Sequence, residues 1–165
     1  MIPAPAGGRP PHRPAPPFPA AALGRTAVRL SGILGLMTSA AGTFDIDRFD
    51  TEKPHDERDG VTLSRAHITK TFHGDLEGGS ETDIIMVHTA VPAAYAGIER
   101  FEGSVHGRKG GFVLQHDAGG TAGVPWMTWK IVETSGTGDL AGIRGEGQII
   151  VGPGGEHSYT LAYEI

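Results

Sequence analysis

Apolar and polar residues alternate along most of the chain after residue 36. The run 61–72, Val-Thr-Leu-Ser-Arg-Ala-His-Ile-Thr-Lys-Thr-Phe, alternates almost strictly and is rich in β-branched residues. This pattern is typical of a half-buried β-strand. No window with helical periodicity separates such runs, which disfavours a parallel βαβ architecture. The chain therefore predicts eight strands, over residues 42–49, 61–72, 83–91, 95–105, 111–116, 124–133, 147–151 and 157–165.

Clusters of glycine lie between the predicted strands and indicate hairpin turns, at residues 78–79, 107–110, 119–120 and 152–155. A long meander of hairpins leaves two exposed edges unless the sheet folds on itself. The pattern therefore predicts an all-β fold, a closed eight-stranded antiparallel barrel. A two-sheet sandwich is the alternative, but the longer runs suit the tilted strands of a barrel better.

Residues 1–36 differ in composition from the rest of the chain. They contain eight of the twelve prolines, four arginines and no acidic residue, for a charge of +4, whereas the remaining ten basic and nineteen acidic residues give −9. Such a segment buries little apolar surface, so we expect a disordered leader before a barrel domain at 37–165, or a misassigned start with Met37 as the true first residue. The apolar stretch 30–36 is short for a signal peptide and for a membrane span, so we expect a soluble, cytoplasmic protein.

Composition excludes several functions. The net charge of −5 shows no basic excess for nucleic-acid binding, and the absence of cysteine excludes a disulfide scaffold, a thiolate metal site and a cysteine nucleophile. No Gly-x-Ser-x-Gly nucleophile elbow is present. We predict no cofactor.

The histidines do not form a local metal motif. There is no His-x-His pair, and His67 and His73 would lie ~20 Å apart on one strand, too far to share an ion. A site assembled across strands, for example from His67, His88 and His116 with Glu99, is the alternative to the prediction of no metal.

The segment 135–147, Ser-Gly-Thr-Gly-Asp-Leu-Ala-Gly-Ile-Arg-Gly-Glu-Gly, is too rich in glycine for a helix interior. It lacks the Lys-Ser or Lys-Thr pair of a phosphate-binding loop. We expect a compact corner with three kinds of position: a positive φ at Gly136 and Gly138, core packing by Leu140 and Ile143, and a close backbone approach at Gly142 and Gly145.

This glycine turn is similar to the turn before a late strand in allene oxide cyclases and dirigent proteins, which are eight-stranded antiparallel barrels. Residues 37–165 more closely resemble the bacterial domain-of-unknown-function family thirty-two twenty-four. The matching stretches are Gly-Thr-Phe at 42–44, Leu-Ser-Arg-Ala at 63–66, Lys-Thr-Phe-His-Gly-Asp at 70–75, Ala-Gly-Ile-Glu-Arg at 96–100, Gly-Phe-Val-Leu-Gln-His at 111–116 and the glycine turn. The resemblance implies an allene-oxide-cyclase-like barrel and supplies no activity. No catalytic residue of the plant enzymes carries over, because only the turn aligns.

Two pairs of consecutive polar residues are candidates for a site. Because neighbouring strand residues face opposite ways, one of Glu99 and Arg100 should point into the barrel. A buried charge is costly unless it is paired. The inward residue of this pair therefore forms either a structural ion pair, with Arg65 or Lys70 as candidate partners, or the polar end of a ligand pocket.

The same argument applies to Gln115 and His116. His116 shares a face with Phe112 and Leu114, so it is the better candidate for the interior, as a ligand-binding group or as a satisfied core histidine. Aromatic residues can complete such a cavity. The predicted ligand-binding residues are Glu99, Arg100, Gln115, His116, Arg65, Lys70, Trp129 and Tyr159.

Three functions are compatible with these patterns. The barrel can bind a small, mostly apolar molecule in its lumen. It can be a cofactor-free isomerase or cyclase in which Glu99 or His116 moves a proton. It can also be a solid barrel that acts through its outer surface, as a homo-oligomer or with another partner.

Overall fold

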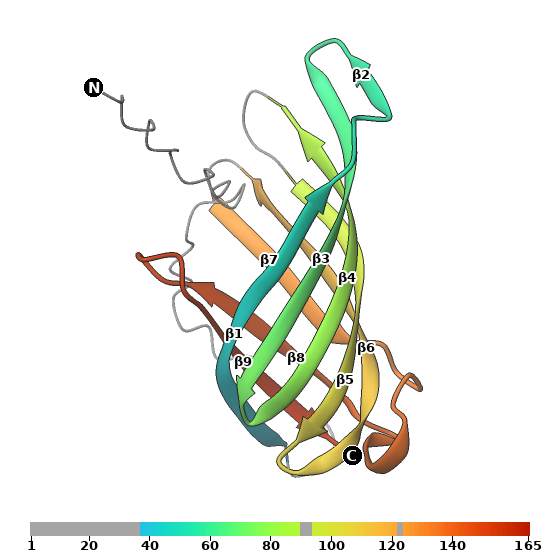
Figure 1. Cartoon of the computed structure of the whole chain (residues 1–165), viewed down its shortest axis with the longest axis vertical. Helices are drawn as coiled ribbons and strands as arrows, with labels where there is room; N and C mark the ends of the chain where they lie inside the picture. The colour runs from blue at the N-terminus through green and yellow to red at the C-terminus, as the bar shows by residue number, and fades with distance from the viewer. Residues whose placement is uncertain (1–36, 90–93, 122–123) are drawn as a thin grey trace, which may run out of the picture.

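The first long strand, β1 (Thr38–Thr51), pairs along both of its edges. The computed structural model describes residues 37–89, 94–121 and 124–165. Within these ranges β1 is antiparallel both to β3 (Val61–Gly74) and to β9 (His157–Glu164). From β1 the sheet continues through β9 and five further strands to β3, so it returns to its starting strand. The predicted closed eight-stranded antiparallel barrel is confirmed (Figure 1). The predicted leader, 1–36, lies outside the described residues.

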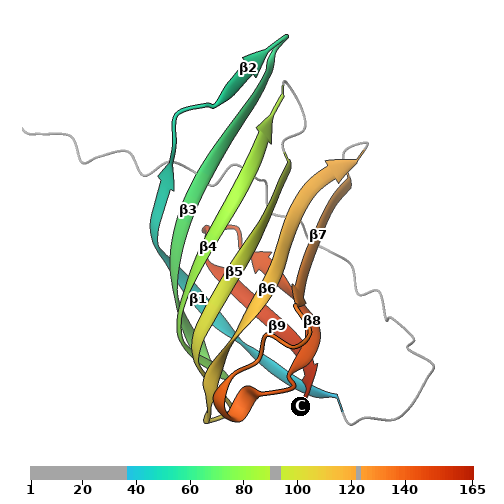
Figure 2. The same ribbon diagram turned by 90° about the vertical axis from the view of Figure 1, so that its right-hand side faces the viewer.

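The remaining strands follow one another as hairpins around the barrel. They are β4 (Leu76–His88), β5 (Ala94–Val105), β6 (Arg108–Thr121), β7 (Val124–Ile131) and β8 (Arg144–Val151). An additional short strand, β2 (Asp56–Arg58), pairs with the start of β3 and extends this hairpin beyond the barrel wall (Figure 2). Among the described residues, no helix is long and apolar enough to span a membrane.

Two of the predicted glycine turns are wrong. Gly78 and Gly79 lie inside β4, and Gly119 and Gly120 lie inside β6. These glycines instead allow close packing: a Cβ on Gly78 would lie 2.3 Å from a backbone oxygen of β5, and one on Gly119 would lie 2.9 Å from an indole ring. Because the strands continue through these glycines, β4 and β6 are longer than predicted, with 13 and 14 residues. The turn predicted within 152–155 is confirmed between β8 and β9.

The segment between β7 and β8 forms a corner around the 3₁₀ turn η1 (Gly138–Leu140), which lies at the lower end of the barrel beside β6 (Figure 2). Leu140 and Ile143 are fully buried, as predicted. The expected positive φ is present at Gly138 (59°) but absent at Gly136. Gly136 makes a close approach instead, and Gly142 has the positive φ, at 88°, so the prediction exchanged the roles of these two residues. The close approach at Gly145 is confirmed, because its Cβ would lie 2.1 Å from a β9 oxygen.

The interior of the barrel contains two apolar clusters. The larger one includes an aromatic group contributed by several strands, namely Phe44, Phe72, Phe101, Phe112, Trp129 and Tyr159. The smaller one is formed by Ala66, Ile68, Ile84 and Met86 of β3 and β4. Burial alternates along β3, β4 and β5, so every second side chain of these strands faces inward. This alternation decides which polar residues enter the lumen.

Candidate functional site

A fully buried carboxylate, Glu99, lies inside the barrel on β5. Its Oε2 accepts hydrogen bonds from Nζ of Lys70 at 2.9 Å and from Nε1 of Trp129 at 3.0 Å. Its Oε1 accepts a hydrogen bond from Oγ of Ser80 at 2.6 Å. Glu99 is therefore the inward member of the Glu99–Arg100 pair, and Lys70, one of the predicted candidate partners, forms an ion pair with it.

Strand register brings these groups together. Lys70 on β3 is the direct neighbour of Ser80 on β4, and Thr82, two residues further along β4, is the direct neighbour of Glu99 on β5. All four residues are at inward positions of consecutive strands, so the long lysine side chain reaches across β4 to the carboxylate. The register of β3, β4 and β5 thus fixes the relative positions of Lys70 and Glu99.

The ion pair keeps Glu99 ionised. Burial by itself raises the pKa of a carboxyl group, but the charge of Lys70, the adjacent imidazole of His116 and the hydroxyl of Ser80 outweigh it and lower the pKa of Glu99 below its usual value. A carboxylate with three hydrogen-bond donors at 2.6–3.0 Å retains its charge in the apolar interior.

His116 on β6 is the second polar group of the interior, opposite Gly97 of β5. Its Nε2 lies 2.8 Å from the hydroxyl oxygen of Tyr95, and the two rings meet edge to face. Its Nδ1 lies 3.5 Å from Oε2 of Glu99 and makes no hydrogen bond within the described part of the chain. Burial, together with the charge of Lys70, lowers the pKa of His116 despite the nearby Glu99, which favours the neutral imidazole.

Burial also affects Tyr95, which is the hydrogen-bond partner of His116. Burial and the charges of Glu99 and Asp117 raise the pKa of the Tyr95 phenol, so the hydroxyl is neutral at physiological pH. The interior thus combines an ionised pair with a neutral imidazole–phenol pair. We call Lys70, Ser80, Thr82, Tyr95, Glu99 and His116 the lumen polar cluster.

Thr82 contributes a second buried polar atom that lacks a partner among the described residues. Its side chain has no solvent exposure, and its Oγ1 makes no hydrogen bond to any of them. It neighbours Glu99 across the β4–β5 pair. Oγ1 of Thr82 and Nδ1 of His116 therefore make no hydrogen bond to the described protein groups, and Nδ1 has an electrostatic contact with Glu99 at 3.5 Å.

Three predicted site residues point away from the lumen. Arg65, Arg100 and Gln115 are exposed on the outer surface, because they occupy the alternate positions of β3, β5 and β6. Arg100 lies 3.9 Å from Glu102, and Gln115 donates a hydrogen bond to Asp117. These three residues do not belong to a site with Glu99.

Two predicted aromatic residues are inside, but only one meets the cluster. Trp129 donates its indole N–H to Glu99. Tyr159 packs in the aromatic group, where its hydroxyl accepts the amide N–H of Leu76 at 2.8 Å and lies 3.3 Å from the carbonyl oxygen of His73. The role of Tyr159 is therefore within the core.

Ser80, Thr82 and Tyr95 are absent from the predicted site. The sequence pattern places a turn at Gly78 and Gly79, so Ser80 and Thr82 lie before the predicted strand 83–91. The period of two therefore assigned neither side chain to the inward or the outward face, although both lie in β4. Tyr95, in contrast, is four residues before Glu99 on the same strand. The period of two could have placed its side chain on the inward face with Glu99.

The alternative metal site is not assembled. His67 faces outward and contacts Asp83 at 2.8 Å, whereas His116 faces the lumen. Among the described residues, no group of three or more histidine, aspartate or glutamate side chains could hold a metal ion.

Comparison with known proteins identifies the family. The family model described as protein of unknown function, DUF3224, matches residues 40–163. The chain belongs to the DUF3224 family. The predicted resemblance to family thirty-two twenty-four is confirmed. A search of curated proteins found no match.

A crystal structure of a DUF3224 protein of unknown function from Shewanella oneidensis MR-1 is similar to this barrel. The two chains are 34% identical, and the alignment covers 78% of this chain and 98% of the other, with a TM-score of 0.72. In this DUF3224 barrel, the lumen polar cluster can donate and accept hydrogen bonds, and its His116–Tyr95 pair can relay a proton.

Proposed function

We propose that this DUF3224 barrel binds a small, mostly apolar molecule whose single polar group meets the lumen polar cluster. The observation that supports this proposal most strongly is the buried Oγ1 of Thr82 beside Glu99, which makes no hydrogen bond to the described residues; Nδ1 of His116 also makes none, although it lies 3.5 Å from Oε2 of Glu99. Buried polar atoms are normally satisfied, because leaving one without a partner costs about 1–3 kcal/mol. A ligand with a hydrogen-bonding group would satisfy them.

The buried ion pair also supports a ligand site. Replacing a buried ion pair by apolar side chains is often neutral or stabilising, so Lys70 and Glu99 are poorly explained by stability alone. The neighbouring aromatic group shows that this barrel can pack an apolar core where no polar chemistry is needed. A role in recognition accounts for the polar cluster between the two apolar clusters.

The chemistry of the cluster defines the ligand class. Lys70 and Glu99 neutralise each other, and His116 and Tyr95 favour their neutral forms. A second buried charge would lack a counter-ion, so the ligand carries an uncharged polar group, such as a hydroxyl or a carbonyl. Eight-stranded barrels can hold one small ligand, and in this proposal the apolar part of the molecule packs against the cluster of Ala66, Ile68, Ile84 and Met86.

One observation favours a second candidate function, a cofactor-free isomerase. The 2.8 Å contact between Nε2 of His116 and the Tyr95 hydroxyl joins a base and an acid beside an ionised carboxylate. Such a pair can transfer a proton within a bound carbonyl compound. Turnover of a compound that binds in the lumen would distinguish the isomerase from a binding protein.

Thermal-shift screening tests the binding function. The library contains apolar molecules that each carry one hydroxyl or carbonyl group. The proteins are the wild type, two inward variants, Glu99→Gln and His116→Ala, and two outward controls at adjacent residues of the same strands, Arg100→Gln and Gln115→Ala. We expect a hit at roughly tenfold its Kd to raise the Tm of the wild type and the controls by about 5 °C, with a much smaller increase in the inward variants.

Two outcomes would contradict the proposal. Equal shifts in the inward and outward variants would show that the ligand binds elsewhere. A library in which no member stabilises the wild type would instead favour a solid barrel that acts through its outer surface. Each variant is compared with its own ligand-free Tm, so a loss of intrinsic stability does not imitate a loss of binding.

A further inference from the structure

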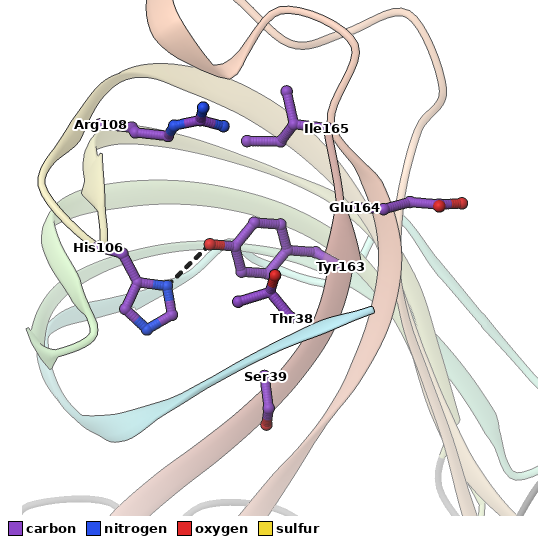
Figure 3. A pocket seen from close by; sticks show the side chains of 7 residues that line it. All are labelled: Thr38, Ser39, His106, Arg108, Tyr163, Glu164 and Ile165. Carbon is purple, nitrogen blue, oxygen red and sulfur yellow. Dashed lines mark hydrogen bonds between the residues drawn. The ribbon is translucent and has the colours of Figure 1, made fainter. Parts of the chain in front are cut away.

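A pocket of about 620 Å³ opens where β1 begins and β9 ends (Figure 3). This volume lies within the range of roughly 300–1,000 Å³ typical of small-molecule sites. Its lining includes no member of the lumen polar cluster. The lining residues are Thr38, Ser39, His106, Arg108, Tyr163, Glu164 and Ile165.

One positively and one negatively charged side chain line this pocket, Arg108 and Glu164. Arg108 is exposed, and its guanidinium makes no hydrogen bond or ion pair with any of the described residues. The acidic lining residue, Glu164, is already bound: its Oε1 accepts a hydrogen bond from Nε of Arg144 at 2.7 Å. Figure 3 shows the Glu164 carboxylate directed away from Arg108. The planar guanidinium can therefore form two parallel hydrogen bonds with an anion.

Another part of the pocket lining, next to Arg108, is held by a chain of three side chains, Asp75, His106 and Tyr163. Oδ2 of Asp75 accepts the amide N–H of Ala41 at 2.8 Å and lies 3.5 Å from Nε2 of His106. Nδ1 of His106 lies 2.8 Å from the Tyr163 hydroxyl (Figure 3). In the tautomer with the proton on Nε2, which faces Asp75, Nδ1 accepts the hydrogen bond that the Tyr163 hydroxyl donates. The Tyr163 side chain is thereby fixed before any ligand arrives.

Apolar surface lies beside these polar groups. The rings of His106 and Tyr163 are stacked, with centroids 6.0 Å apart, and Ile165 is 44% exposed. Thr38 and Ser39 add hydroxyl groups at the start of β1. The pocket thus combines the Arg108 guanidinium, short hydroxyl donors and an apolar wall, which suits a molecule with an anionic head and an apolar body.

We propose that this pocket is a second ligand site, which binds a small organic carboxylate through Arg108. One guanidinium fork matches one carboxylate group. A doubly charged phosphate would need further cations, and the nearby carboxylates of Asp75 and Glu164 would repel its second charge. The apolar part of the ligand contacts Ile165 and the edge of Tyr163.

Benzoate and its uncharged isostere benzamide are suitable probes, measured by NMR titration of the full chain. We expect benzoate to bind the wild type with a Kd on the order of 1 mM and to shift the amide signals of His106, Arg108 and Tyr163. Benzamide should bind at least about 10-fold more weakly, because it cannot form the charged pair with Arg108. The signals of Glu99 and His116 should stay unchanged, which separates this pocket from the lumen polar cluster.

The matched variants are Arg108→Gln and Lys109→Gln, which remove the same charge from adjacent residues of β6. Arg108→Gln should weaken benzoate binding about 10-fold or more, and Lys109→Gln by less than about 2-fold, because only Arg108 lines the pocket. An equal loss of benzoate affinity in the two variants would show that general electrostatic attraction explains the binding, and would overturn the proposal. It would also be overturned by equal affinities for benzoate and benzamide, or by no shift of the pocket signals at about 10 mM benzoate.

Discussion

Nζ of Lys70 lies 2.9 Å from Oε2 of Glu99 inside the barrel, and the two side chains are only 3% and 0% exposed. The pair spans β3 and β5 and also binds Ser80 and Trp129. Because it is excluded from water, each charge depends on the other for its solvation. This relationship makes the centre of the barrel sensitive to single substitutions.

Glu99→Gln should lower the free energy of unfolding by about 3 kcal/mol, because it leaves Lys70 buried without a counter-charge. The double variant Lys70→Met/Glu99→Gln should recover part of this loss, since no unpaired charge remains. Urea denaturation of the wild type, both single variants and the double variant measures the coupling between the two residues. A double variant that is as unstable as the sum of the single variants would show that the two charges do not depend on each other.

Ser80 and Thr82 should respond in opposite ways to the loss of their hydroxyl groups. Ser80→Ala removes a 2.6 Å hydrogen bond to Glu99 and should cost about 2 kcal/mol. Thr82→Val removes a hydroxyl with no protein partner among the described residues and should be neutral or stabilise the fold by up to about 1 kcal/mol. Thermal denaturation without ligand compares the two variants. A large loss in Thr82→Val would indicate that Oγ1 is satisfied in solution.

His116 should make stability depend on pH. Burial lowers the pKa of His116 in the folded protein below the ~6.5 of an unfolded histidine, so the unfolded chain binds more protons as the pH falls below about 6.5. Stability is therefore full above that pH and declines as the pH falls toward the lowered pKa of the folded state. The pKa of His157 is also lowered by burial and by Lys70, which adds to the slope.

Tm measurements between about pH 7.5 and pH 5.5 test this dependence. His116→Gln should flatten the slope, because it removes the group that must be buried without its proton. Gln115→Ala, at the adjacent outward position, should keep the wild-type slope. If His116→Gln retains the full slope, other groups are responsible for the acid sensitivity.

Two glycines of neighbouring strands should differ sharply in their tolerance of a methyl group. A Cβ on Gly97 would lie 2.3 Å from the Asp83 carbonyl oxygen, so Gly97→Ala should lower the free energy of unfolding by about 2 kcal/mol or more. At Gly79 the nearest atom would be 3.4 Å away, an ordinary contact, so Gly79→Ala should change stability by less than about 1 kcal/mol. Similar urea midpoints for the two variants would contradict this packing argument.

The contact between β7 and β8 should be the weakest part of the barrel wall. Only Trp129 with Gly147 and Lys130 with Glu146 are paired there among the described residues, whereas β3 and β4 pair continuously from residues 62 to 72 of β3. Amide hydrogen exchange should therefore be faster in β8 near Ile150 than in the middle of β3 or β4. Equal protection in these strands would show that the barrel opens as a single unit.

The period-two pattern of the sequence by itself determined the fold class and many of the residues that point into the barrel. It required one member of each pair, Glu99–Arg100 and Gln115–His116, to enter the lumen, and the structure selects Glu99 and His116. It also placed Phe112 and Leu114 on the same face as His116. This information is local, because a strand's backbone geometry alone makes alternate side chains point in opposite directions.

The tertiary structure decided which inward residues meet. Lys70 reaches Glu99, and Trp129 donates to the same oxygen, only because the registers of β3 to β7 align these positions around the closed barrel. Register depends on hairpin geometry and on close approaches such as that at Gly78, which alternation within one strand cannot reveal. Alternation is a property of one strand, whereas a site needs the stagger between strands, and closure of the sheet determines that stagger.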